Sequence, residues 1–230
     1  MLELRNVSVI SQKEYRLQDI TLKIESGSIY GLIGANGAGK TTLIKAILGL
    51  VEINNGFIKI DDLYLSDNRN LLTKIGTLIE RASLYTHLTA IENLTIASLQ
   101  LNVPESEVQE ILKLIGLFEN KDKKVEKFSL GMKQRLGIGL AIINKPSLLI
   151  LDEPTNGLDP DGIIQIRELI ISINKQFNTT VLFASHLLNE IELVATHIGF
   201  IQKGNLVFHG HISDFKTIGS LEKSYQSYAK

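Results

Sequence analysis

Two hydrophobic patterns divide the chain, one typical of buried strands and one typical of helices. Short runs rich in β-branched residues predict strands at 7–10, 22–24, 29–33, 57–60, 148–151, 180–184 and 197–202. Helical spacing prevails from residue 90 to residue 143 and returns after residues 40, 161, 186 and 212. The outer parts therefore alternate strand with helix, as a parallel sheet requires, and a helical insertion interrupts them.

Composition supports a folded protein and says little about its partners. With 230 residues, 44% of them hydrophobic, the chain can build one substantial core. Lys and Arg number 24 against 25 Asp and Glu, so no nucleic-acid partner is expected. The sequence has no cysteine, no signal-peptide pattern and no apolar run near the roughly 18 residues of a membrane-spanning helix. We therefore expect a cytoplasmic location, with any membrane reached through a partner.

The string "GANGAGKT" at 34–41 fits the phosphate-binding loop G-x-x-x-x-G-K-[ST], with a predicted strand before it and a predicted helix after it. Its glycines let successive backbone amides face a phosphate, and the helix N-terminus adds a favourable dipole. Lys40 is expected to reach the β- and γ-phosphates of a nucleotide, and the Thr41 hydroxyl to bind Mg²⁺. The residues of this loop expected to bind ATP are Gly34, Ala35, Asn36, Gly37, Ala38, Gly39, Lys40, Thr41 and Thr42.

Two further strand ends carry groups suited to phosphate hydrolysis. In "LLILDEP" an apolar strand delivers Asp152, an expected Mg²⁺ ligand, and Glu153, which can accept a proton from water attacking the γ-phosphate. His186 follows another strand, where an imidazole can hold that water in line. Lys40, Glu153 and His186 are therefore the expected catalytic residues. A GTPase would need the element N-K-x-D, and the nearest string, "NKQF", lacks the aspartate, which disfavours guanine specificity.

The motifs "GANGAGKT", "FSLGMKQR", "LLILDEP", "NGLD" and "SH" follow one another in an order similar to that of the ATP-binding subunits of ABC transporters. More narrowly, "FSLGMKQRLGIGLAI" and "LDEPTNGLDPDGI" look like the subunits that drive bacitracin-type and lantibiotic self-protection exporters. The resemblance implies an α/β fold: a P-loop NTPase with a mostly parallel core sheet, an N-terminal antiparallel β part and an inserted helical subdomain. It implies one nucleotide-binding domain over 1–230, with a core lobe at 1–80 and 144–230 and the helical subdomain at 81–143.

In the signature position of that family the chain has "SLGM", where Ser129 and Gly131 match the usual residues while Leu130 and Met132 replace glycine and glutamine. Ser129 can cap a helix whose N-terminus presents amides to an anion. By resemblance, Ser129, Gly131 and Met132 bind the γ-phosphate held by the opposite subunit of a pair. Asp159 can cap the helix that starts at the following proline, and the family places this loop at the subunit junction.

Two positions depart from the family pattern. Glu80 stands where the family has a glutamine that reaches the metal, so we expect it to join Thr41 and Asp152 around Mg²⁺, and the bacitracin and lantibiotic subunits share this glutamate. The usual place of the adenine-stacking aromatic residue falls on Ser11, so the nearest aromatic residue, Tyr15, is expected to stack on the base.

The segment that follows Glu80 contains Arg81 and Tyr85, and there the family's membrane subunit docks a short helix. Tyr85 is either an anchor for that helix or a tyrosine of the core, and the sequence leaves both open.

These expectations combine into an ATPase subunit that uses ATP and Mg²⁺ and pairs with a second nucleotide-binding subunit. On the inner face of the membrane it would serve a polytopic permease that expels an antimicrobial peptide. The alternatives are an ABC ATPase for another substrate, a soluble ABC-type regulator such as a translation factor, a chromosome or repair ATPase, and a metabolite kinase. The regulator predicts two such domains in one chain, the repair ATPase a long coiled coil, and the kinase leaves "FSLGMKQR" without a role.

Overall fold

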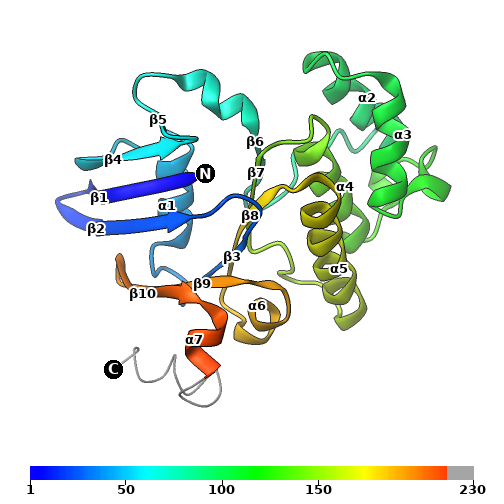
Figure 1. The fold of residues 1–230 in the computed structure, drawn as a ribbon. Coiled ribbons are helices and arrows are strands. Elements are labelled where there is room, and N and C mark those ends of the chain that lie inside the picture. Colours follow the sequence, from blue (N-terminus) through cyan, green and yellow to red (C-terminus); the bar gives the residue numbers. More distant parts are fainter. Residues whose placement is uncertain (217–230) are drawn as a thin grey trace. The chain divides into compact units, whose positions relative to one another are not determined.

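In the computed structural model residues 1–216 are described, and they form two compact units (Figure 1). The outer unit combines residues 1–73 with the segment from 180 onward, and the middle unit spans 74–179. Each unit has its own strands and helices, and they are taken in turn. The lobe boundaries expected from the sequence stay a prediction.

An antiparallel sheet opens the outer unit, with strand order β2-β1-β4-β5. Its strands are β1 Leu2–Ser11, β2 Glu14–Ile24, β4 Asn55–Ile60 and β5 Leu63–Tyr64. β1 and β2 extend beyond the apolar runs that predicted them, because their polar residues face solvent while alternate apolar residues are buried. The predicted antiparallel N-terminal part is therefore present, and the 3₁₀ helix η1 (Arg69–Lys74) leads out of it.

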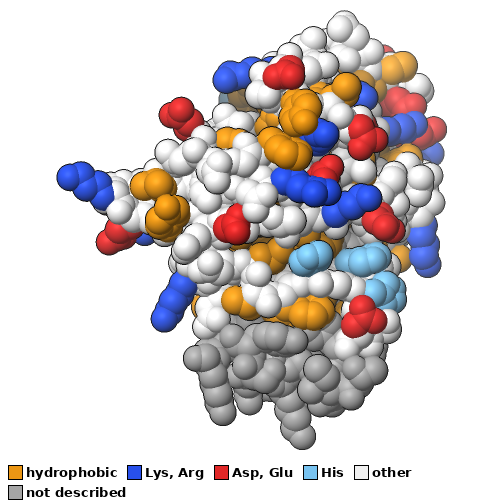
Figure 2. Space-filling view, turned by 60° about the vertical axis from the view of Figure 1, so that its left-hand side comes forward, with side chains coloured by type: hydrophobic (Ala, Val, Ile, Leu, Met, Phe, Trp, Pro, Cys, Tyr) orange, Lys and Arg blue, Asp and Glu red, His pale blue; other side chains and the backbone are white. Residues whose placement is uncertain are grey.

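Parallel strands form the second sheet of the outer unit. β3 (Ile29–Ile33) pairs in parallel with β8 (Thr180–Ser185) on one side and β9 (His197–Gln202) on the other, and every residue of β3 and β8 is buried. β10 (Asn205–His211) pairs antiparallel with β9 and brings His211 into edge-to-face contact with His197. Figure 2 shows histidine side chains gathered on one face. The helices of this unit are α1 Lys40–Ile47, α6 Leu188–Val194 and α7 Ile212–Lys216.

In the middle unit two short parallel strands support a group of helices. β6 (Ile75–Leu78) pairs with β7 (Leu148–Asp152), and α4 (Leu130–Ile142) packs on β6 so closely that a Cβ on Gly76 would collide with the Ala141 carbonyl oxygen. The α4 run is apolar on several faces because α2 and α3 pack on it as well. The remaining elements are α2 Ala90–Gln100, α3 Glu105–Leu114, α5 Pro160–Phe177, η2 Phe118–Asn120 and η3 Val125–Lys127.

The predicted α/β fold, with its helical insertion, is confirmed. The sequence pattern missed β5, β6 and β10, because two of them are very short and the third has only three apolar residues, followed by His-Gly-His. Within residues 1–216 no helix combines the length and the apolar character needed to cross a bilayer.

Candidate nucleotide-binding site

The phosphate-binding loop of the outer unit runs from β3 to α1 and curls around its own lysine. Lys40 is almost fully buried, and its Nζ donates hydrogen bonds to the carbonyl oxygens of Gly34 (2.6 Å) and Ala35 (3.2 Å). Gly39 is the N-cap of α1 with φ 115°, a conformation that a residue with a Cβ adopts only under strain. The first turn of α1 has no acidic residue, so the positive end of its dipole is available to a phosphate. This is the strand-to-helix turn that the motif predicts.

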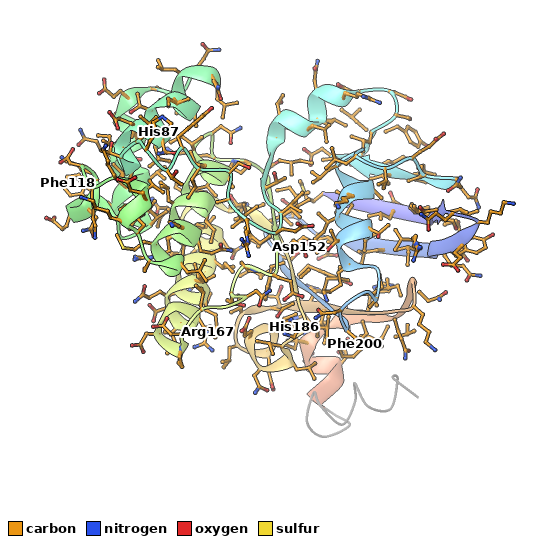
Figure 3. The ribbon with its side chains drawn as sticks, turned by 180° about the vertical axis from the view of Figure 1, so that it is seen from behind. His87, Phe118, Asp152, Arg167, His186 and Phe200 are labelled. Atoms are coloured by element: carbon orange, nitrogen blue, oxygen red, sulfur yellow. The ribbon has the colours of Figure 1, made fainter. Side chains whose placement is uncertain are left out.

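His186 lies at the same sheet edge as this loop. Ser185, the last residue of β8, stands opposite Ile33, the last residue of β3, so His186 and Gly34 leave neighbouring parallel strands at the same level. On the other side Ile33 is opposite Phe200 of β9, and Figure 3 labels both His186 and Phe200. The His186 side chain is exposed at this edge.

Tyr15 lies in the hairpin that joins β1 to β2 and has a side chain 57% exposed. Its neighbours Arg16 and Leu17 pack on the phosphate-binding loop, because the Arg16 carbonyl oxygen lies 3.2 Å from where a Cβ on Gly39 would be. An exposed aromatic ring one residue from that contact fits a base-stacking role, and the role stays a prediction.

The candidate acids of the middle unit leave two paired strands at one edge. Leu78 of β6 is opposite Leu151 of β7, so Glu80 follows one strand at the level where Asp152 ends the other and Glu153 follows it. Asp152 is only 2% exposed, whereas Glu80 is exposed. Glu80 (φ 57°) and Glu153 (φ 50°) both adopt the left-handed region, which costs a residue with a side chain about 1–3 kcal/mol.

The donor types fit Mg²⁺, which prefers hard oxygen ligands. Asp152 and Glu80 offer carboxylates in the middle unit, and Thr41 offers a hydroxyl in the first turn of α1 in the outer unit. Across residues 1–216 no three His, Asp or Glu side chains gather closely enough to hold a metal by themselves. Mg²⁺ commonly keeps waters and binds substrate phosphates with one or two carboxylates, and the pair Asp152 and Glu80 suits that mode.

A pocket of about 570 Å³ in the middle unit is bordered by two helix N-termini. Ser129 caps α4, because its Oγ accepts from the Met132 N–H at 3.2 Å, and Asp159 caps α5, because its Oδ1 accepts from the Gly162 N–H at 3.1 Å. The structure therefore brings the signature residues and the Asp159 loop to one pocket, and both predicted caps are confirmed. The pocket is lined by Ser129, Leu130, Gly131, Met132, Arg135, Gly157, Leu158, Asp159, Asp161, Gly162 and Gln165.

Arg135 also lines this pocket, and the sequence analysis assigned it no role. Its Nη1 donates to the carbonyl oxygens of Ile115 (3.1 Å) and Gly116 (3.2 Å) at the end of α3, and partial burial lowers the pKa of the guanidinium. The signal was its spacing, four residues after Gly131 on one helix, which places both residues on the same face.

Tyr85 is half exposed (50%), which excludes the alternative that it belongs to the core. Its backbone is nevertheless fixed by the buried Asn93 of α2, whose Oδ1 accepts from the Tyr85 N–H (2.9 Å). Asn93 Nδ2 donates to the carbonyl oxygens of Tyr85 (3.1 Å) and Thr89 (2.8 Å). No sequence pattern distinguishes Asn93, since its role depends on contacts across a loop.

Proteins named as transport ATP-binding proteins match most of the chain. The family model described as ABC transporter matches residues 17–156. SrtF of Streptococcus pyogenes, named as a lantibiotic transport ATP-binding protein, is 43% identical over 207 residues, which are 90% of this chain and 89% of that protein. BcrA of Bacillus licheniformis, named as a bacitracin transport ATP-binding protein, is 44% identical over 199 residues, which are 86% of this chain and 64% of that protein.

Solved structures agree with this match. The structure of an ATP-binding subunit of an ABC transporter superposes with a TM-score of 0.87 at 29% identity and covers all of both chains. The ATP-binding cassette MJ0796, solved as a dimer in a post-hydrolysis state with ADP and Pi, gives a TM-score of 0.80 at 26% identity over 92% of this chain and 99% of that chain. The chain therefore belongs to the ABC transporter family and is one of its ATP-binding ATPase subunits, which dimerise and work with a membrane component.

Proposed function

We propose that this subunit hydrolyses ATP within a closed dimer and so drives the export of an antimicrobial peptide, of the bacitracin or lantibiotic type, through a separate polytopic membrane subunit. The observation that carries this proposal is the 43% identity to the lantibiotic relative along nearly the full length of both chains. The proposed location is the inner face of the membrane, and the exposed Tyr85, with Arg81 near it, is the proposed contact with the membrane subunit.

Each proposed role follows from the chemistry of the side chain and its position at a strand end or helix N-terminus. Lys40 neutralises the β- and γ-phosphates, His186 orients the attacking water, and Glu153 accepts its proton. Thr41, Asp152 and Glu80 would hold Mg²⁺, which when bound supplies charge neutralisation for the phosphates. Ser129, Gly131 and Met132 are assigned to the phosphate of the partner copy's ATP, and Tyr15 to the adenine.

The first test replaces Glu153 with glutamine, which keeps the shape of the side chain but removes the base. Steady-state ATPase activity is expected to fall by about 10²–10⁴-fold, while ATP still binds. Glu168→Gln, an exposed glutamate of α5 in the same unit, is the matched control and should leave the rate unchanged. A Glu153→Gln protein that turns over ATP as fast as the control would remove Glu153 from its role.

The second test addresses the substrate and the partner. A strain that lacks this chain should become more sensitive to bacitracin or to a lantibiotic, and the original gene, but not the Glu153→Gln form, should restore resistance. Purification from gently solubilised cells should recover a polytopic membrane protein with the chain. Recovery with ribosomes instead would favour the soluble regulator, and unchanged resistance to both peptide types would favour an ABC ATPase for another substrate.

A further inference from the structure

Two leucines and three glycines lie close together where the N-terminus of α4 approaches the loop that follows Glu153. We call this set, Leu130, Gly131, Gly157, Leu158 and Gly162, the leucine–glycine junction. The Leu130 Cδ2 atom lies 3.3 Å from the position that a Cβ on Gly157 would take. Leu158 packs in the opposite direction, with its Cδ2 3.8 Å from the Cβ position of Gly131 and its Cβ 3.3 Å from that of Gly162. The Leu130 side chain therefore lies close to Gly157, and the Leu158 side chain lies close to Gly131 and Gly162.

The loop from Glu153 to Asp159 is short and tied at both ends. The Asn156 N–H donates to the Glu153 carbonyl oxygen and the Leu158 N–H to the Thr155 carbonyl oxygen, each at 3.1 Å. Strand β7 fixes the start of the loop, and the Asp159 cap of α5 fixes its end. The middle is exposed, with Gly157 at φ 79°, and there Leu130 supports it. Support at this point reaches Glu153 through the Asn156 hydrogen bond.

Leu130 stands at the position where the family usually has glycine, which has no side chain to make this contact. The leucine is 51% exposed, and its Cδ2 atom is the atom that approaches Gly157. The φ of 79° at Gly157 favours glycine in its own right, and the absence of a side chain there leaves room for Leu130. A glycine at position 130 would lack the side chain that approaches Gly157.

We propose that Leu130 is a positioning residue that couples the two ATP sites of the dimer. This inference rests on the proposed function, in which Ser129 and Gly131 bind the phosphate of the partner's ATP while Glu153 acts on ATP bound to its own copy. Leu130 lies between these two groups, next to Ser129 in sequence and against Gly157 in space. Binding of the partner's phosphate at α4 therefore holds the loop, and with it Glu153, in the position required for hydrolysis.

The test compares Leu130→Ala with Leu130→Met, which refills the contact, and with Leu99→Ala, a matched change of an exposed leucine on helix α2 of the same unit. Amide hydrogen exchange is measured on the protein without nucleotide. At Asn156 and Leu158 exchange should be at least about fivefold faster in Leu130→Ala than in the original protein, and unchanged in the other two variants. Unchanged exchange in Leu130→Ala would overturn the support of the loop.

The second readout is ATPase rate against ATP concentration. The original protein should show a Hill coefficient near 2, and Leu130→Ala should show one near 1 with kcat lowered about tenfold, because a displaced catalytic group loses rate steeply. Leu130→Met should restore both values. A Hill coefficient of 1 in the original protein, or an equal loss in Leu99→Ala, would overturn the coupling. A protein that binds ATP but never hydrolyses it would overturn the proposed function, while the exchange data would still decide whether Leu130 supports the loop.

Discussion

Replacing Asn93 with alanine should destabilise the middle unit markedly, because this one side chain holds the backbone of two other residues, Tyr85 and Thr89. The Asn93 side chain is buried, with 2% of the residue exposed, and it makes three hydrogen bonds to the main chain of Tyr85 and Thr89. Alanine removes all three bonds and leaves an N–H and two carbonyl oxygens without this partner. The segment that presents Tyr85 at the surface would lose its support from α2.

The magnitude follows from the count of bonds. At about 1 kcal/mol of net stability for each hydrogen bond, the loss is about 3 kcal/mol. For a chain of this size each kcal/mol lowers Tm by about 2–4 °C, so a decrease of about 6–12 °C is expected. Hydrogen exchange should be fastest at the Tyr85 amide, since its acceptor is gone.

Ser98→Ala supplies the matched control on the same helix. Ser98 is equally buried, but its Oγ donates to the Thr95 carbonyl oxygen (2.8 Å) one turn back in α2, so its loss frees no loop. This control should cost less than about 1 kcal/mol in urea unfolding. If Asn93→Ala and Ser98→Ala proved equally stable, the clamp on Tyr85 would contribute nothing and the reasoning would be refuted.

Two further changes test local packing and electrostatics. Gly76→Ala should lower the free energy of unfolding by about 3 kcal/mol or more, because the new methyl group meets the Ala141 backbone, which cannot rotate away. Denaturant unfolding measures this change. A decrease below about 1 kcal/mol would contradict the tight contact of β6 with α4. Hydrogen bonds from the Thr89 N–H and hydroxyl lower the pKa of Glu92 below 4.5, so the stability that this carboxylate adds is present above pH 4.5 and lost as the pH falls. Glu92→Gln should therefore lose less stability between pH 7 and pH 3 than the original protein, as thermal unfolding at the two values would show, and identical losses would count against the effect.

Local sequence signals predicted the parts of the structure that depend on a few adjacent residues. Ser129 and Asp159 were expected to cap helices, and both do, because an N-cap needs only a short polar side chain and the amide three residues later. The phosphate-binding loop was equally predictable, since its glycines and Lys40 act within a single turn.

Contacts between distant residues could not be predicted in this way. The packing of Leu130 on Gly157 joins residues that are far apart in sequence, and neither has a pattern that indicates the other. Strand β6 could not be predicted either. Its four residues include a glycine and have no strand pattern of their own, and they form a strand because they pair with β7. Exposure of Tyr85 was also undecided, because the aromatic type fits both a core and a surface.

The pairing of β6 with β7 has a consequence for how position 80 can evolve. The contact of Gly76 with α4 and the match of Leu78 to Leu151 determine the course of the main chain before Glu80 is reached. A glutamine or a glutamate at position 80 would then start from the same backbone, because the contacts that determine its course lie before this position. In the proposed role of Glu80, exchange of glutamate for glutamine would therefore change the charge beside Mg²⁺ and leave the course of the backbone as it is.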